Sequence, residues 1–291
     1  MKKSLLVVAM ACVLLAPATA IAQHQIFDTV NGAIAASGRD DVQLAVVEWI
    51  TDTDEVGQTV FFNDRGNKQL SGHWVPNDPR NGNGAELPWL MDFEFTADIG
   101  ALDQVVGIAN AMQTWQDQNC SDIPLVDLGF FPGDYGYVQF LLGAGGTPGF
   151  FPFLTHAGWL PAGFFDLLAP NGSNSILAVT FTLVWVDADG PTDIDSNGKD
   201  DVALREIYYN DNFNWGDGTG GTVDIETIAL HEVGHGLSQQ HFGKLSRTDK
   251  NGKFHFAPRA VMNAGYTGPQ RDLAGTDNGG HCSIWGSWPN N

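Results

Sequence analysis

Basic residues are scarce in this chain of 291 residues, which has 14 Lys and Arg against 34 Asp and Glu and a formal net charge of -20 at pH 7. A surface this acidic repels nucleic acid and anionic membranes, whereas it favours solubility and attracts divalent cations. The composition therefore argues against nucleic acid as a partner, and we expect a soluble monomer.

Long apolar runs are missing beyond the N-terminus, so we expect no membrane insertion. The first residues carry two lysines, an apolar run from Leu5 to Ala16 and then small residues, which is typical of a signal peptide. Cleavage is expected after Ala20 or Ala22, with residues 1–22 as the signal. The sequence therefore predicts an exported protein that is secreted or periplasmic.

Cysteine is rare as well, with 3 in the chain. Cys12 lies inside the apolar run and is expected to leave with the signal. Cys120 and Cys282 then remain in an oxidising compartment, where an even pair favours a disulfide. The alternative is two buried, unpaired thiols.

The chain after the signal is long enough for one large domain, with or without an N-terminal extension. Residues 23–90 are interpreted as that extension or as the first strands of the domain, and residues 91–291 as the domain itself. Short apolar runs at 44–50 and 59–62 predict strands, as does the stretch 91–97.

The strongest periodic signals lie further along the chain. Apolar residues recur at three- and four-residue spacing over 101–118, which predicts an amphipathic helix. The run 176–186 is the most hydrophobic and predicts a central strand, followed by another at 203–211. Residues 130–172 mix aromatics with Gly and Pro, so we expect a packed irregular excursion there, with the wall of an apolar cleft as the alternative.

An acidic loop at 187–201 follows the hydrophobic run. Its residues Asp193, Asp195, Asn197 and Asp201 alternate as oxygen donors around a glycine, as a calcium ion requires. Leu204 stands where an EF-hand has its bidentate glutamate. We therefore expect an isolated calcium loop, with a solvated acidic turn as the alternative.

Three histidines and a glutamate are concentrated in HEVGHGLSQQH, residues 231–241. A helix is expected from about 224 to 236, and it places His231 and His235 on one face, close enough to share a cation. Glu232 lies beside them. His241 can join only if the chain turns sharply after the helix, near Gly236 and Ser238.

The motif resembles H-E-x-x-H-x-x-G-x-x-H, the signature of the metzincin metalloproteases, with Ser238 in place of the glycine. AVMNAGY, residues 260–266, looks like the Met-turn of the matrixin branch, and EIYYNDNFNWG, residues 206–216, is similar to the segment that precedes the active-site helix there. The resemblance implies an α/β (α+β) fold with a twisted mixed sheet, an active-site helix, a backing helix and an irregular C-terminal subdomain.

The same resemblance implies a zinc endopeptidase whose catalytic domain spans 91–291. His231, His235 and His241 would hold Zn²⁺ and Glu232 would be the general base for hydrolysis of a peptide or protein substrate. Met262 and Tyr266 would support the site, and an edge strand above the helix would bind substrate. The alternatives are a secreted protein with purely structural zinc and calcium, and a zinc hydrolase of non-peptide amides or esters. The cysteine that keeps matrixin zymogens latent has no counterpart between the signal and Cys120.

Overall fold

The computed structural model describes residues 18–52, 69–82, 84–247 and 254–290. The expected strand at 59–62 and the signal residues up to 17 lie outside these ranges. Both expected cleavage points fall within the first described helix, Ala18–Ala36. Every helix in the described ranges is too short or too polar to cross a membrane.

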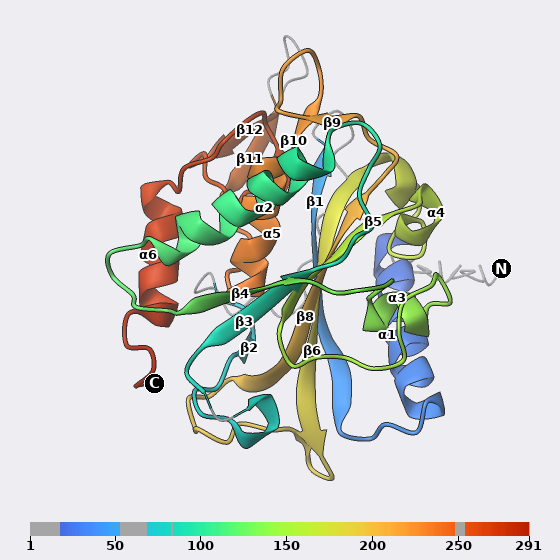
Figure 1. The fold of residues 1–291 in the computed structure, drawn as a ribbon, viewed down its shortest axis with the longest axis vertical. Helices are drawn as coiled ribbons and strands as arrows, with labels where there is room; N and C mark the ends of the chain where they lie inside the picture. The colour runs from blue at the N-terminus through green and yellow to red at the C-terminus, as the bar shows by residue number, and fades with distance from the viewer. Residues whose placement is uncertain (1–17, 53–68, 83, 248–253, 291) are drawn as a thin grey trace, which may run out of the picture.

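One mixed sheet, to which the described residues contribute nine strands, forms the centre of the molecule (Figure 1). Its strand order is β13-β1-β6-β8-β5-β3-β4, while β2 pairs with β8 and β7 with β6. Its strands are β1 (Val42–Asp52), β2 (Gly72–His73), β3 (Leu87–Met91), β4 (Leu125–Phe130), β5 (Leu154–Leu160), β6 (Ile176–Asp187), β7 (Gly190–Pro191), β8 (Asp200–Asn210) and β13 (Gly265–Tyr266). Strands β1, β6 and β8 are antiparallel neighbours, whereas β8, β5, β3 and β4 run parallel. Two small ribbons pair β9 (Trp215–Gly216) with β10 (Val223–Asp224) and β11 (Lys244–Arg247) with β12 (Phe254–Ala257).

Helices cover both faces of the sheet, as Figure 1 shows. They are α1 (Ala18–Ala36), α2 (Ala101–Gln116), α3 (Tyr137–Leu141), α4 (Ala162–Phe165), α5 (Ile225–Gly236) and α6 (Gly275–Trp285). Helices α2, α5 and α6 lie on one side, and α1, α3 and α4 on the other. Each side has its own apolar core, so the sheet is buried on both faces.

The long periodic segments are confirmed as the elements that the sequence predicts. The helix expected at 101–118 is α2, and its Trp115 packs on α5 and donates a hydrogen bond of 2.8 Å to the carbonyl of Leu230. The hydrophobic run at 176–186 is β6, which lies between β1 and β8 with nearly every residue buried. Because β1 pairs with β6, residues 42–52 belong to the same sheet as the later strands.

Three segments differ from expectation. The excursion at 130–172 contains β5, a fully buried strand in the middle of the sheet. Its Gly158 has φ +92° and lies so close to Glu94 that a Cβ there would clash with it. The strand expected at 91–97 ends at Met91. The C-terminal part, expected to be irregular, includes the 11-residue helix α6, which is rich in glycine and therefore has no helical signal in its sequence.

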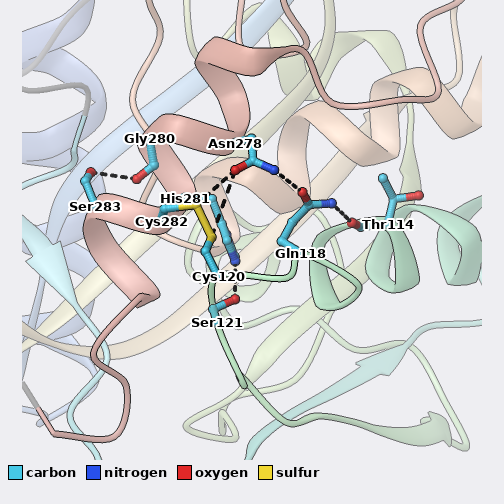
Figure 2. Close-up of a disulfide and its surroundings, with 9 residues drawn as sticks. All are labelled: Thr114, Gln118, Cys120, Ser121, Asn278, Gly280, His281, Cys282 and Ser283. Atoms are coloured by element: carbon cyan, nitrogen blue, oxygen red, sulfur yellow. Dashed lines mark hydrogen bonds between the residues drawn. A yellow bond between two sulfur atoms is a disulfide. The ribbon is translucent and has the colours of Figure 1, made fainter.

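A disulfide joins Cys120, just after α2, to Cys282 in α6 (Figure 2). The side chain of Asn278 donates a hydrogen bond of 2.5 Å to Gln118, and the hydroxyl of Ser121 lies 2.7 Å from Nε2 of His281. These contacts fix the end of α2 against α6, although the two lie 162 residues apart in the chain. The bridge therefore closes a loop that contains most of the sheet and all of α5.

Replacing both cysteines by serine is expected to lower the free energy of unfolding by about 2–5 kcal/mol, because a loop this long loses much of its entropy in the cross-linked unfolded chain. Thermal unfolding of the Cys120→Ser/Cys282→Ser protein, compared with the oxidised wild type, measures the effect. A midpoint unchanged between the two proteins would contradict this account.

Candidate metal centre

Helix α5 begins with a capped N-terminus and carries two of the three clustered histidines. The side chain of Asp224 accepts a hydrogen bond of 3.2 Å from the backbone N–H of Thr227, which satisfies a free donor of the first turn. Within the helix, Gly234 leaves room for Met262, because a Cβ at this position would lie 2.3 Å from the Met262 sulfur. The helix can therefore press closely on the Met-turn beneath it.

The chain turns after α5 at Ser238, which has φ +68° in the left-handed region. Backbone bonds from Ser238 to His235 (3.0 Å) and from Gln239 to Gly234 (2.9 Å) form the Schellman arrangement that ends many helices. Glycine is common there, since a side chain at positive φ costs about 1 kcal/mol.

Hydrogen bonds stabilise Ser238 in this conformation. Its buried hydroxyl lies 2.9 Å from Arg205 Nη1 and 3.1 Å from His73 Nδ1. Gly236 has a different role, because it lacks a positive φ and a Cβ there would lie 2.8 Å from Leu154. Serine thus replaces the glycine of the motif at the turn, while Gly236 permits close packing on β5.

The turn brings the third histidine back to the first two. The Nε2 atoms of His231, His235 and His241 lie 2.9–3.1 Å from one another. Three ligands of a tetrahedral zinc, each about 2.05 Å from the metal, would be about 3.3 Å apart. This group of three buried imidazoles can therefore hold a metal ion.

The opposite ring nitrogens decide which tautomer each histidine adopts. Nδ1 of His231 lies 2.7 Å from the carbonyl of Val261, and Nδ1 of His235 lies 2.9 Å from the carbonyl of Gln239. A carbonyl only accepts, so both Nδ1 atoms carry the proton and both Nε2 lone pairs point to the common centre. Burial lowers the pKa of all three rings, that of His241 to about 3, which keeps them neutral as metal ligands must be.

Two carboxylates lie beside the histidines. Glu232 accepts a hydrogen bond of 2.6 Å from the hydroxyl of Thr180 on β6. Glu48 on β1 lies with Oε2 3.1 Å from Nδ1 of His241. Burial raises the pKa of both carboxyl groups, and for Glu232 the bonds from Thr180 and from the Ile50 backbone act in the opposite direction.

The segment 260–266, which contains Met262, is held by helix α6. The carboxylate of Asp277 in α6 accepts hydrogen bonds from the backbone N–H groups of Val261 (2.9 Å) and Met262 (3.1 Å). Since Val261 also binds His231, this contact connects α6 to the histidine cluster. Tyr266 lies at the other end of α5, where its hydroxyl accepts a bond of 3.1 Å from the Asp224 backbone. Met262 and Tyr266 thus support α5 from two sides.

The whole cluster is enclosed. His231, Glu232 and His235 have 0% of their surface exposed and His241 has 5%. On the side of the sheet, β6 contacts the cluster through Thr180 and β1 through Glu48. Among the described residues, β1 pairs with β13 only at Thr51 and Asp52, so along most of its length it is the edge strand of the described sheet.

The acidic loop forms a second candidate cluster. Asp193, Asp195 and Asp201 offer oxygens within 4.8 Å of one another, so this group too can hold a metal ion. The fit is partial, because Asp201 is buried and binds Arg80 at 2.7 Å. The Asp193 carboxylate accepts from the backbone of Asn197 and Gly198, which orders the loop around its glycine turn.

No protein-family model matches the chain, and no curated protein matches it either. The likeness to metzincins therefore depends on the residues of the histidine motif and the Met-turn alone.

Several residues around the centre carry no signal in the sequence. They are Glu48, His73, Thr180, Arg205 and Asp277. Each comes from a separate element and contacts the cluster only through the tertiary fold. The one available hint is a lone acidic residue within an apolar strand, which applies to Glu48 in LAVVEWI.

Replacing Ser238 tests the turn. Ser238→Ala keeps the strained backbone and loses the bonds to Arg205 and His73, so it should lower the free energy of unfolding by about 1.5–3 kcal/mol. Ser238→Gly loses the same bonds but relieves the strain, and should be the more stable of the two by about 1 kcal/mol. Denaturant unfolding of both variants measures the difference. An alanine variant as stable as the glycine variant would refute the strain at Ser238.

Calcium added to the chelated protein is expected to raise the melting temperature if the acidic loop binds it. At a calcium concentration 100 times the Kd, binding contributes about 2.7 kcal/mol, which corresponds to roughly 5–10 °C in a protein of this size. Asp193→Asn should abolish the response, since it removes a carboxylate that has no basic partner in the loop. The same melting temperature with chelator and with calcium would identify an ordinary acidic turn.

Proposed function

We propose that this protein is an exported zinc-dependent endopeptidase of the metzincin type, similar to matrixins. The observation that carries the proposal is the convergence of three Nε2 atoms within 3.1 Å on neutral rings, with Glu232 beside them. The arrangement of helix, turn and Met-turn around this point supports the resemblance found in the sequence. The mixed sheet with α5 and α2 packed beneath it agrees with the implied fold.

The donor set fits zinc, because imidazole nitrogens in near-tetrahedral spacing suit this ion. Bound zinc would polarise a peptide carbonyl and acidify water. Glu232 would take up a proton during attack on the peptide carbonyl and deliver it to the leaving amine. Thr180 would hold one carboxylate oxygen of Glu232 in place and leave the other for the proton.

Substrate would bind along the edge of β1 by strand addition, since β1 is, in the part of the chain that the structure describes, the edge strand next to α5. The backbone N–H of Leu44 on this strand donates to Asn31 of α1 at 2.8 Å and the Ile50 backbone bonds to Glu232, so an added strand would pair with the stretch between these two residues. Because the histidines and Glu232 are buried, a peptide can reach them only if covering residues move aside.

The same burial favours a second candidate, a secreted protein in which the metal is purely structural. In that reading the bond between Thr180 and Glu232 is a packing contact and Glu232 transfers no proton. Both functions require the three histidines, so metal binding alone does not separate them. Hydrolysis of a peptide bond does.

Glu232→Ala should retain zinc while hydrolysis of an unfolded, casein-type substrate falls by about 10²–10⁴-fold, because the general base is lost. The purified protein is assayed for zinc content and for digestion, each with and without a zinc chelator. Chelation should abolish the wild-type activity.

Glu226→Ala is the matched control. Glu226 is on the same helix but bonds to Asn110 on α2 (3.1 Å), away from the histidines, so its loss should leave hydrolysis unchanged. Stoichiometric zinc without any digestion by the wild type would reject the endopeptidase in favour of the structural site. Retained digestion by Glu232→Ala would reject the role of Glu232.

A further inference from the structure

Glu48 is a buried acidic residue on β1, next to the histidine cluster. It is 1% exposed, and neither of its carboxylate oxygens has a hydrogen-bond partner of good geometry among the described residues. A buried carboxylate without partners is costly unless a positive charge lies near it. Its Oε2 lies 3.1 Å from Nδ1 of His241.

The three histidines differ in what lies behind them. His231 and His235 face neutral backbone carbonyls through Nδ1, at 2.7 and 2.9 Å. Nδ1 of His241 faces the Glu48 carboxylate, whose Oε2 lies 3.1 Å away. A carboxylate that binds the non-coordinating nitrogen of a metal-binding imidazole fixes the ring orientation and makes the coordinating nitrogen a more basic ligand. His241 needs this most, because it follows the helix on a turn whereas the other two are held by α5.

The sheet holds Glu48 in its position. Glu48 pairs directly with Thr180 across β1 and β6, and neighbouring cross-strand residues present their side chains on the same face. Thr180 binds Glu232 and Glu48 contacts His241, so one cross-strand pair touches both the proposed base and the third ligand. A slip of β1 by one residue would turn Glu48 to the opposite face, so the register of this pair decides that Glu48 reaches His241.

Charge also favours the arrangement. A dication on three neutral imidazoles would add two positive charges to a buried region, and Glu48 and Glu232, ionised beside it, would supply two negative ones. Glu48 is outside the group of nitrogens that can share one ion, since its contact is with Nδ1 and the shared point is at Nε2.

We propose that Glu48, from the N-terminal strand, is a positioning residue of the metal centre that orients His241 and balances the charge of the bound ion. The inference rests on the proposed zinc site but does not depend on proteolysis. The proposal assigns strand β1, residues 42–52, a role in holding the metal centre, although this strand lies outside the metzincin-like region.

Zinc affinity of the full-length protein tests the proposal, measured by competition with a chromophoric chelator. Glu48→Ala removes both acceptor and charge and should weaken zinc binding by about 100-fold, whereas Glu48→Gln keeps an acceptor for Nδ1 and should lose about 10-fold. Cobalt substitution gives a second readout, since the absorption of a three-histidine site should persist in both variants. Melting of the metal-free proteins shows that each variant folds.

Glu206→Gln is the matched control, because Glu206 is also a fully buried carboxylate of the sheet but binds backbone groups of α3 on the opposite face. It should lower the melting temperature and leave zinc affinity unchanged.

Zinc affinities of both Glu48 variants within twofold of the wild type would overturn the proposal. Unchanged zinc affinity of the variants together with faster digestion would also overturn it, because Glu48 would then be a residue that obstructs access of substrate. If the wild type binds zinc but digests nothing, the endopeptidase proposal is rejected. The zinc affinities of the Glu48 variants then still decide whether Glu48 positions His241. A wild type that binds no zinc overturns both.

Discussion

Three uncharged imidazole rings point their lone pairs at one buried spot, and the rest of the structure serves to hold them there. Lone pairs at such short range repel one another, so the rings stay together only because a neighbouring group contacts the Nδ1 atom of each ring. Helix α5 fixes two of them, and the left-handed residue Ser238 returns the chain so that His241 can be the third. The Met-turn presses on α5 from below, and Asp277 holds the Met-turn.

The N-terminal segment contributes more to this centre than its sequence suggests. Residues 23–90 have no recognisable likeness to metzincins, yet β1 brings Glu48 to His241 and His73 on β2 contacts Ser238. Trp74 donates a further bond of 3.0 Å to the carbonyl of Gly236. Residues of the N-terminal segment therefore contact both the end of α5 and the turn that follows it. The N-terminal segment and the histidine motif form one structural unit at the site.

The sequence was sufficient for the parts of the structure that depend on local pattern. The periodicity of 101–118 and the hydrophobic run at 176–186 indicate α2 and β6, and the spacing of His231 and His235 on a helix predicts their shared face. The sequence did not indicate strand β5 or helix α6, because both lie in glycine-rich segments with little local preference for helix or strand. Packing and long-range contacts, such as the bonds between Asp277 and the backbone of Val261 and Met262, determine their structure.

Glu48, Thr180 and Arg205 could not be assigned to the site for a different reason. Each contacts the site through strand pairing between segments far apart in the chain, and no residue near them in sequence indicates the partner. Ser238 was the opposite case: its position in the motif was evident, but only the buried contacts with Arg205 and His73 explain how a serine occupies a conformation that favours glycine.

The pairing of β1 with β13 has a consequence for biogenesis. The hydroxyl of Thr51 donates to the carbonyl of Ala264, 213 residues later, and Asp277 lies further still towards the C-terminus. Because residues as far apart as Glu48 and Asp277 contact the histidine cluster and the segment beneath it, the surroundings of the three histidines are complete only once the chain has been synthesised as far as α6. An ion that binds there would meet the finished site only after that point.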